Sequence, residues 1–156
     1  REAFLEAFRQ NRQDLLLGFC VMGGIFSEGI DLDGEKLIGA AVVGAGIPQV
    51  GPERELLKQY FDRSGENGFD YAYRYPGMNK VLQAAGRVIR TTEDTGVILL
   101  LDERFRNREY RELFPREWED CRIVQRRNLG TALNVTCDPR GAGIRSASSP
   151  SAAGKF

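Results

Sequence analysis

The stretch Gln83-Ala84-Ala85-Gly86-Arg87-Val88-Ile89-Arg90 combines a polar side and an apolar side in one helical pattern. We expect it to close a helix over Met78–Arg90, on which Gln83, Arg87 and Arg90 leave the same face. Neither arginine has an acidic residue one turn before it, so two forked guanidinium groups are predicted to be available to a polyphosphate. The alternative is a solvated basic face at the end of the helix, where arginine also interacts favourably with the helix dipole.

Apolar runs on both sides of this stretch predict an α/β fold. The opposite face of the expected helix carries Val81, Ala85, Val88 and Ile89. Continuous apolar runs predict buried strands over Leu15–Met22, Leu37–Val43 and Val97–Leu101, with Arg122–Gln125 as a short further strand. Strands that alternate with helices predict a mostly parallel sheet covered on both faces, with the loops that follow the strands along one edge, where ligands bind.

Helical patterns fill the segments between these runs. We expect helices over Glu2–Gln10, Pro52–Arg63 and Asn107–Phe114. In the second of these, the apolar residues Leu56, Leu57, Tyr60 and Phe61 share one side. The aromatic stretch Phe69–Gly77 is expected to be a linker, whose rings either pack the segment onto the core or stack on nucleic-acid bases.

Composition excludes several classes of protein. The chain has 156 residues, a net charge of zero and no histidine, which rules out Ser-His-Asp and Cys-His catalysis and histidine-ligated zinc. Cys20, Cys121 and Cys137 are far apart, so we expect no metal site in the chain and a reducing, cytoplasmic location; Cys20 is expected in the core. Only four basic residues are lysines (Lys36, Lys58, Lys80 and Lys155), so arginine, which favours planar bidentate partners, dominates.

The two ends of the chain differ in character. The sequence begins at Arg1 with no charged-then-apolar leader and has no apolar run long enough to span a bilayer, so we interpret it as a soluble piece of a longer protein. We expect residues 1–137 to form one domain. Residues 138–156 are rich in Gly, Ala, Ser and Pro and are predicted to be a disordered tail.

A glycine-bounded loop, Gly24–Asp31, follows the first apolar run. Its glycines have the spacing of a P-loop, but Ile30 and Asp31 stand where a lysine and a hydroxyl would be needed. The loop still offers backbone amides and the Ser27 hydroxyl to a nucleic-acid phosphate, and carboxylates at Glu28 and Asp31 to a ribose or a water. The alternative is a strand-to-helix turn in which Asp31 caps the next element.

Two further segments follow predicted strands. The segment Gly44–Gln49 is an incomplete dinucleotide fingerprint, because Gln49 replaces its third glycine, so a nicotinamide-dependent oxidoreductase is disfavoured. The segment Asp102–Arg104 ends the last long strand and is either a local salt link or a group that faces a ligand.

The order of these motifs closely resembles the second motor domain of superfamily 2 DNA helicases of the DinG and xeroderma pigmentosum group D type. The segment Gly24–Asp31 resembles helicase motif V and Gln83–Arg90 resembles motif VI, and the resemblance covers Leu5–Asp120. It implies a RecA-like three-layer α/β domain without a Walker A loop of its own. The family continues after Phe114–Trp118 into another short helix, which the residues after Gln125 do not predict.

The resemblance also implies roles for individual residues. Arg87 and Arg90 would be arginine fingers on the γ-phosphate, with Gln83 orienting the phosphate or the attacking water. Nucleotide contacts would come from Glu28, Gly29, Asp31 and Gly86, and contacts with single-stranded DNA from Phe26 and Ser27. ATP with Mg²⁺ would be shared with an N-terminal motor domain of the same protein, which often holds an iron–sulfur cluster. No membrane partner is implied.

These expectations leave one rival from another class. A RecA-like domain can serve as a non-enzymatic module that binds nucleic acid or protein. The arginines at positions 87 and 90 favour the motor over this module, because a scaffold has no use for two cations that face the cleft. This domain alone is not expected to hydrolyse ATP, because no segment supplies a Walker A lysine.

Overall fold

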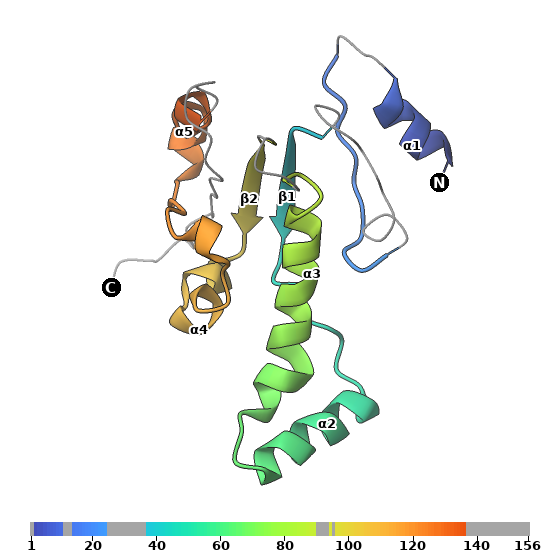
Figure 1. Cartoon of the computed structure of the whole chain (residues 1–156), viewed down its shortest axis with the longest axis vertical. Coiled ribbons are helices and arrows are strands. Elements are labelled where there is room, and N and C mark those ends of the chain that lie inside the picture. The colour runs from blue at the N-terminus through green and yellow to red at the C-terminus, as the bar shows by residue number, and fades with distance from the viewer. Residues whose placement is uncertain (1, 11–13, 25–36, 90–93, 95, 137–156) are drawn as a thin grey trace.

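A computed structural model describes residues 2–10, 14–24, 37–89, 94 and 96–136 of the chain (Figure 1). Within these residues helices alternate with two strands, which confirms the predicted α/β class. The predicted tail, residues 138–156, lies outside the described part of the chain.

The two strands form a parallel pair. Strand β1 (Gly39–Val43) lies beside β2 (Val97–Leu101), from Gly39 opposite Val97 to Val43 opposite Leu101. A parallel pair needs a long crossover, and the chain between the strands supplies it with two α-helices. Both strands lie within their predicted ranges.

Helix α3 (Tyr75–Ala85) covers one face of this pair. The core is formed by buried side chains of the helix and of both strands, among them Val42, Met78, Val81, Ala85, Ile98 and Leu100. On β1 the side chain of Val43 alternates away from α3 and is 72% exposed. The second face of the pair is therefore open at Val43 within the described residues, whereas on β2 the side chains of that face, Leu99 and Leu101, are half-buried.

The first apolar run does not form the strand that its composition predicts. Residues 14–24 follow helix α1 (Glu2–Arg9), and Leu15 and Phe19 are 84% and 88% exposed. No hydrogen bond joins this run to β1 among the described residues. Cys20, expected in the core, is exposed as well. An apolar run records a tendency to be buried, but a strand also needs a neighbour with free backbone groups, which local sequence does not specify.

An arm made of two helical segments extends beyond the carboxyl ends of the strands (Figure 1). Helix α2 (Pro52–Arg63) has the predicted bounds and packs against η2 (Asp70–Arg74), a π-helical segment that runs directly into α3. The predicted linker over Phe69–Gly77 is therefore helical.

The aromatic rings of the arm pack against one another. Phe61 stacks on Tyr71 with ring centroids 3.9 Å apart, and Phe69 stacks on Tyr73 at 5.4 Å. Stacking of these rings stabilises the helical conformation of η2, which the composition of the segment did not predict. These contacts favour the packing interpretation of the aromatic stretch.

Short helices follow β2. They are η3 (Glu103–Arg106), α4 (Arg108–Arg111), η4 (Arg116–Trp118), η5 (Arg126–Asn128) and α5 (Leu129–Thr136). Buried rings of Phe105, Tyr110 and Trp118 join the first three to the core. The predicted helix over Asn107–Phe114 is shorter than expected, Arg122–Gln125 forms no strand, and α5 appears where no helix was predicted. Residues 122–125 have no partner strand among the described residues, and a strand needs one.

Candidate functional site

The carboxyl end of α3 presents the residues that the sequence singled out. Gln83 is exposed on the last turn, Gly86 is exposed at the C-cap, and Arg87 follows it half-buried. The predicted helix over Met78–Arg90 is too long, because α3 ends at Ala85. Gln83, Arg87 and Arg90 were expected to share one face of a regular helix. Arg87 instead lies beyond the end of α3.

Backbone hydrogen bonds show how the helix ends. The Gly86 amide still donates to the Leu82 carbonyl at 2.8 Å, but the Arg87 amide donates to Ala84 at 3.3 Å and the Val88 amide to Ala85 at 3.0 Å. Bonds to the third preceding residue form a tighter turn than the α-helix. Glycine at position 86 weakens the helix at this point, since it is among the poorest helix formers. The turn sets the direction in which Arg87 leaves the helix.

Buried neighbours anchor Arg87 on both sides. Ala85 and Val88 are 3% and 5% exposed and belong to the core cluster. A side chain added at Gly96 would meet Val88 Cγ1 at 2.4 Å, so this turn packs tightly on the start of β2. The backbone that carries Arg87 is therefore held by packing.

A second group of residues surrounds the carboxyl ends of the strands. The Asp102 carboxylate accepts hydrogen bonds from the Arg104 amide at 2.9 Å and from its guanidinium Nε at 2.9 Å and Nη2 at 2.7 Å. The bond from the Arg104 side chain holds the pKa of Asp102 below its usual value, with a further contribution from the Ala45 backbone, although partial burial opposes the shift. The same pairing raises the pKa of Arg104. Of the two interpretations of Asp102–Arg104, the structure supports the local salt link.

Glycines bring the loop after β1 against the amino-terminal part of α3. Gly44 and Gly46 have positive φ angles of 87° and 65°. A Cβ atom at Gly46 would lie 2.7 Å from the Gly77 carbonyl oxygen, and one at Gly77 would lie 2.6 Å from the Ala45 carbonyl oxygen. Two backbones meet here at a distance that only glycine allows.

The two groups lie at opposite edges of the sheet. Gly77 lies at the carboxyl edge and Val88 at the amino edge, so α3 runs antiparallel to the strands. Gly77 and Arg87 are separated along this direction by about 15 Å, at a rise of about 1.5 Å per residue. The structure therefore does not bring Asp102 together with Gln83 and Arg87.

The start of the predicted motif V loop lies against α3. A Cβ atom at Gly23, whose φ is 76°, would meet the Lys80 side chain at 3.2 Å. Lys80 precedes Gln83 by one helical turn, so the chain that leads into the loop passes α3 one turn before Gln83. Lys80 was not among the predicted site residues, although its position three residues before Gln83, on the same side of the helix, could have indicated it.

Several predicted site residues lie outside the described part of the chain. They are Phe26, Ser27, Glu28, Gly29, Asp31 and Arg90. Among the described residues, no three His, Cys, Asp or Glu side chains are grouped so that they could hold a metal ion. None of the described helices combines the length and the apolar character that crossing a membrane requires.

Comparison with known proteins places the chain in a family. Residues 1–121 match the family described as the helicase C-terminal domain. The chain is 36% identical over 89 residues, 56% of its length, to the ATP-dependent DNA helicase DinG of Photobacterium profundum, of which these residues make up 13%. No solved structure matches the chain significantly.

Other relatives are helicases too. The chain is 30% identical over 124 residues, 74% of its length, to the XPD helicase subunit of general transcription and DNA repair factor IIH of Dictyostelium discoideum, and spans 15% of that protein. A probable ATP-dependent helicase of Methanocaldococcus jannaschii is 29% identical over 105 residues, 62% of the chain and 16% of that relative. The chain thus spans about a seventh of the length of these relatives. Because the family match covers residues 1–121 of 156, the chain belongs to the helicase C-terminal domain family of the DinG and XPD type, with its RecA-like α/β fold.

Proposed function

We propose that this chain is the second motor domain of an ATP-dependent DNA helicase. In the complete protein it closes on a first motor domain, completes the ATP site between them and contacts single-stranded DNA. The observation that carries this proposal is the family match over residues 1–121, which includes the whole stretch Gln83–Arg90. The ATPase and unwinding activities belong to the complete protein, of which this chain is a part.

The anchored end of α3 supports an electrostatic role. Arg87 leaves a turn whose neighbours Ala85 and Val88 are buried, so its backbone needs little rearrangement when a phosphate arrives. Gly86 is exposed and has no side chain, which leaves room for a phosphate group near the backbone. Gln83 is exposed one turn earlier.

These features fit the chemistry of phosphoryl transfer. Negative charge is spread over the γ-phosphate oxygens as the bond to the β-phosphate breaks. We assign Arg87 and Arg90 to these oxygens as arginine fingers, and Gln83 to the orientation of the phosphate or the attacking water. In other nucleotide hydrolases an arginine finger contributes about 10³–10⁵ in rate. Binding of the Mg²⁺ that accompanies ATP is assigned to the first motor domain.

The loop over Gly24–Asp31 is assigned to coupling between DNA and nucleotide. Its amides and the Ser27 hydroxyl, with Phe26 beside it, would contact the DNA backbone, and Glu28, Gly29 and Asp31 would face the nucleotide. The contact between Gly23 and Lys80 supports this assignment, because a shift of the loop would be felt on α3 one turn before Gln83.

The test is DNA-stimulated ATP hydrolysis by the complete protein with Arg87→Ala or Arg90→Ala. We expect each variant to lose at least about 10³ in turnover while nucleotide binding is largely kept. Arg111→Ala, which removes an exposed arginine on α4, is the matched control and should be near wild type. If both finger variants hydrolyse ATP normally, the α3 end is a structural surface, and the non-enzymatic interaction module becomes the better description.

A further inference from the structure

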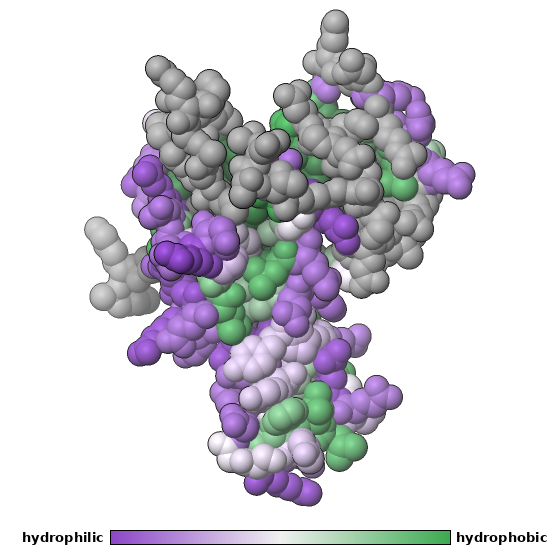
Figure 2. Space-filling model, in the orientation of Figure 1, coloured by the Kyte–Doolittle hydropathy of each residue, from purple (hydrophilic) through white to green (hydrophobic). Residues whose placement is uncertain are grey.

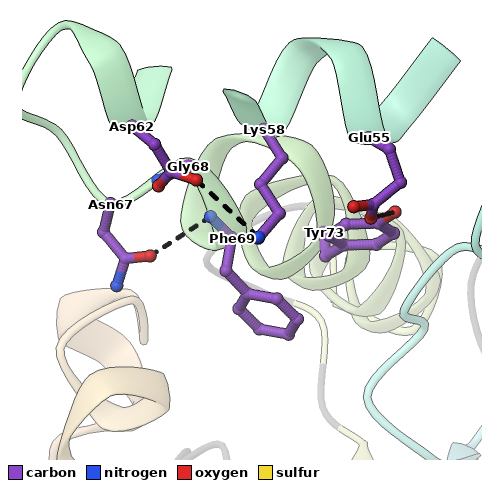
Figure 3. Close-up of polar contacts among 7 residues, drawn as sticks. All are labelled: Glu55, Lys58, Asp62, Asn67, Gly68, Phe69 and Tyr73. Carbon is purple, nitrogen blue, oxygen red and sulfur yellow. Dashed lines mark hydrogen bonds and ion pairs between the residues drawn. The ribbon is translucent and has the colours of Figure 1, made fainter. Parts of the chain in front are cut away.

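Helix α2 turns polar side chains toward the molecule and apolar side chains away from it. On the inner face, Arg54 Nη1 donates to the Ala72 carbonyl at 2.8 Å, and the Tyr73 hydroxyl donates to Glu55 at 2.5 Å. Figure 3 shows Glu55, Lys58 and Asp62 on this side, facing η2. The Phe61 ring is the apolar contribution of α2 to this contact.

The outer face of α2 is an exposed apolar patch. Leu56, Leu57 and Tyr60 are 69%, 40% and 64% exposed, and Figure 2 shows apolar groups gathered at the end of the molecule where α2 lies. A helix with only one covered side normally covers its apolar side. The helical pattern predicted these three residues on one side of the helix together with Phe61, but only Phe61 packs inward. The usual arrangement is reversed, which is typical of a surface that contacts another protein.

Charges at the two ends of the patch are opposite. Glu53, Leu56, Leu57, Tyr60 and Arg63 follow one another at intervals that keep them on one helical face. Glu53 and Arg63 are exposed, and neither forms an ion pair within the part of the chain that the structure describes. The face therefore has an anion at its amino end, apolar groups in the middle and a cation at its carboxyl end.

This arrangement is complementary to itself when reversed. Glu53 and Arg63 are equally distant in sequence from Lys58, and so are Leu56 and Tyr60. If a second α2 is laid antiparallel with position 58 at the centre, each Glu53 faces an Arg63 and each Leu56 faces a Tyr60. Such matching is what an isologous two-fold interface requires.

We propose that the outer face of α2 binds the same face of a second copy of this chain, antiparallel about a two-fold axis. Figure 1 places α2 at the end of the arm, away from the strand pair, where a second α2 can approach. The proposal rests on the contacts of α2 alone and is independent of the proposed function. A single helix pair buries less than the roughly 1,200–2,000 Å² of a standard interface, so the dimer is weak and depends on concentration.

Charge reversal tests the pairing. In sedimentation velocity of the 156-residue chain at low salt and rising concentration, Glu53→Arg or Arg63→Glu alone should weaken the dimer about three- to tenfold, since two ion pairs become repulsive. The double variant Glu53→Arg/Arg63→Glu should restore it, because the reversed charges again face opposite ones. Glu66→Arg makes the same charge change on an exposed residue outside the helix and should leave the dimer unchanged.

Other outcomes would overturn the proposal. A chain that stays monomeric at every concentration, or a double variant as weak as the single ones, rules out the antiparallel α2 pair. Association through the exposed run before Gly23 is a different explanation, and Leu17→Ser/Phe19→Ser would then abolish association while the charge reversals have no effect. If hydrogen exchange of α2 is already slow in monomers of the complete protein, the patch is covered by another part of the same polypeptide.

Discussion

Asp102 stabilises the start of η3 at the carboxyl edge of the sheet. Its carboxylate caps η3 through the Arg104 amide and also binds the Arg104 guanidinium through two atoms. The Asp102 side chain is 12% exposed, whereas that of Arg104 is 42% exposed, so solvent screens the pair in part. The contribution of the cap and the bidentate pair is therefore modest, and it depends on the ionised form of Asp102.

Asp102→Asn should destabilise the domain by about 1–2 kcal/mol at neutral pH, because asparagine can still cap η3 but loses the charge and the second acceptor oxygen that hold the Arg104 guanidinium. Since the folded state lowers the pKa of Asp102, this stabilisation is present above the unfolded value, about 3.9, and is lost as pH falls through the folded value. Thermal unfolding should show a gap between wild type and variant of about 2–6 °C that narrows on acidification. Glu103→Gln, an exposed neighbour, is the control; a gap that does not change with pH would contradict the assignment.

Arg87 shows how one residue depends on its neighbours. Its side chain leaves a tight turn that begins at Gly86, and this turn is held by Ala85 and Val88 in the core. The arginine at position 87 supplies the positive charge, while the buried residues on either side fix the direction in which its side chain leaves the backbone. A loss of ATP turnover in Arg87→Ala would report on the guanidinium side chain, because the buried neighbours that hold the turn are unchanged.

Helix α3 links the two edges of the sheet. Its amino-terminal part meets the loop after β1 through Gly46 and Gly77, and its carboxyl end carries Gln83 and leads into Arg87. Because a helix is stiff over this length, a displacement at Gly77 moves the far end as well. The close approach of the backbones at Gly46 and Gly77 therefore helps to position the carboxyl end of α3, which is proposed to bind the nucleotide.

Gly77→Ala should destabilise the domain by about 1–3 kcal/mol, because the new Cβ atom would lie 2.6 Å from the Ala45 carbonyl oxygen and the backbone must shift. The change alone favours a helix by up to about 1 kcal/mol, so the clash decides the sign. Gly130→Ala is the matched control: it lies in α5 with nothing within 4 Å of the new atom, and it should stabilise. Urea unfolding measures the change in the free energy of unfolding for both variants. If both variants are stabilised, the contact at Gly77 is looser than described.

The whole molecule leaves large apolar areas in contact with solvent. Val43 on β1 and the run before Gly23 are exposed in addition to the outer face of α2. The chain spans about a seventh of the length of its relatives, and this leaves room for elements that cover such areas in the complete protein. Of the exposed areas, α2 is the one whose charges match a second copy.

Deletion of residues 138–156 should leave the melting temperature of the domain almost unchanged. This segment has few large apolar side chains, so it cannot offset the entropy of ordering by burial. Thermal unfolding of the chain with and without the segment measures the effect. A drop of several degrees would show that the segment packs on the domain, and the proposed domain boundary at residue 137 would then be wrong.

Local patterns determined much of this protein. The alternation of apolar runs and helical segments predicted the α/β class, α2 at its observed bounds, and strands close to β1 and β2. The motif order identified the helicase family, which the comparison confirms. The roles of Arg87, Arg90 and the motif V residues stay predictions.

Tertiary structure alone decided the rest, because it concerns which surfaces meet. Composition made Leu15–Met22 look buried, yet burial depends on a neighbour that the described residues do not supply. Composition made Phe69–Gly77 look like a linker, yet stacked rings from α2 and η2 hold it helical. The side of α2 that faces the molecule followed from partners far along the chain, Ala72 and Tyr73, which bond to Arg54 and Glu55. A sequence specifies local tendencies at each residue, but the partner that satisfies them is set only when the chain is folded.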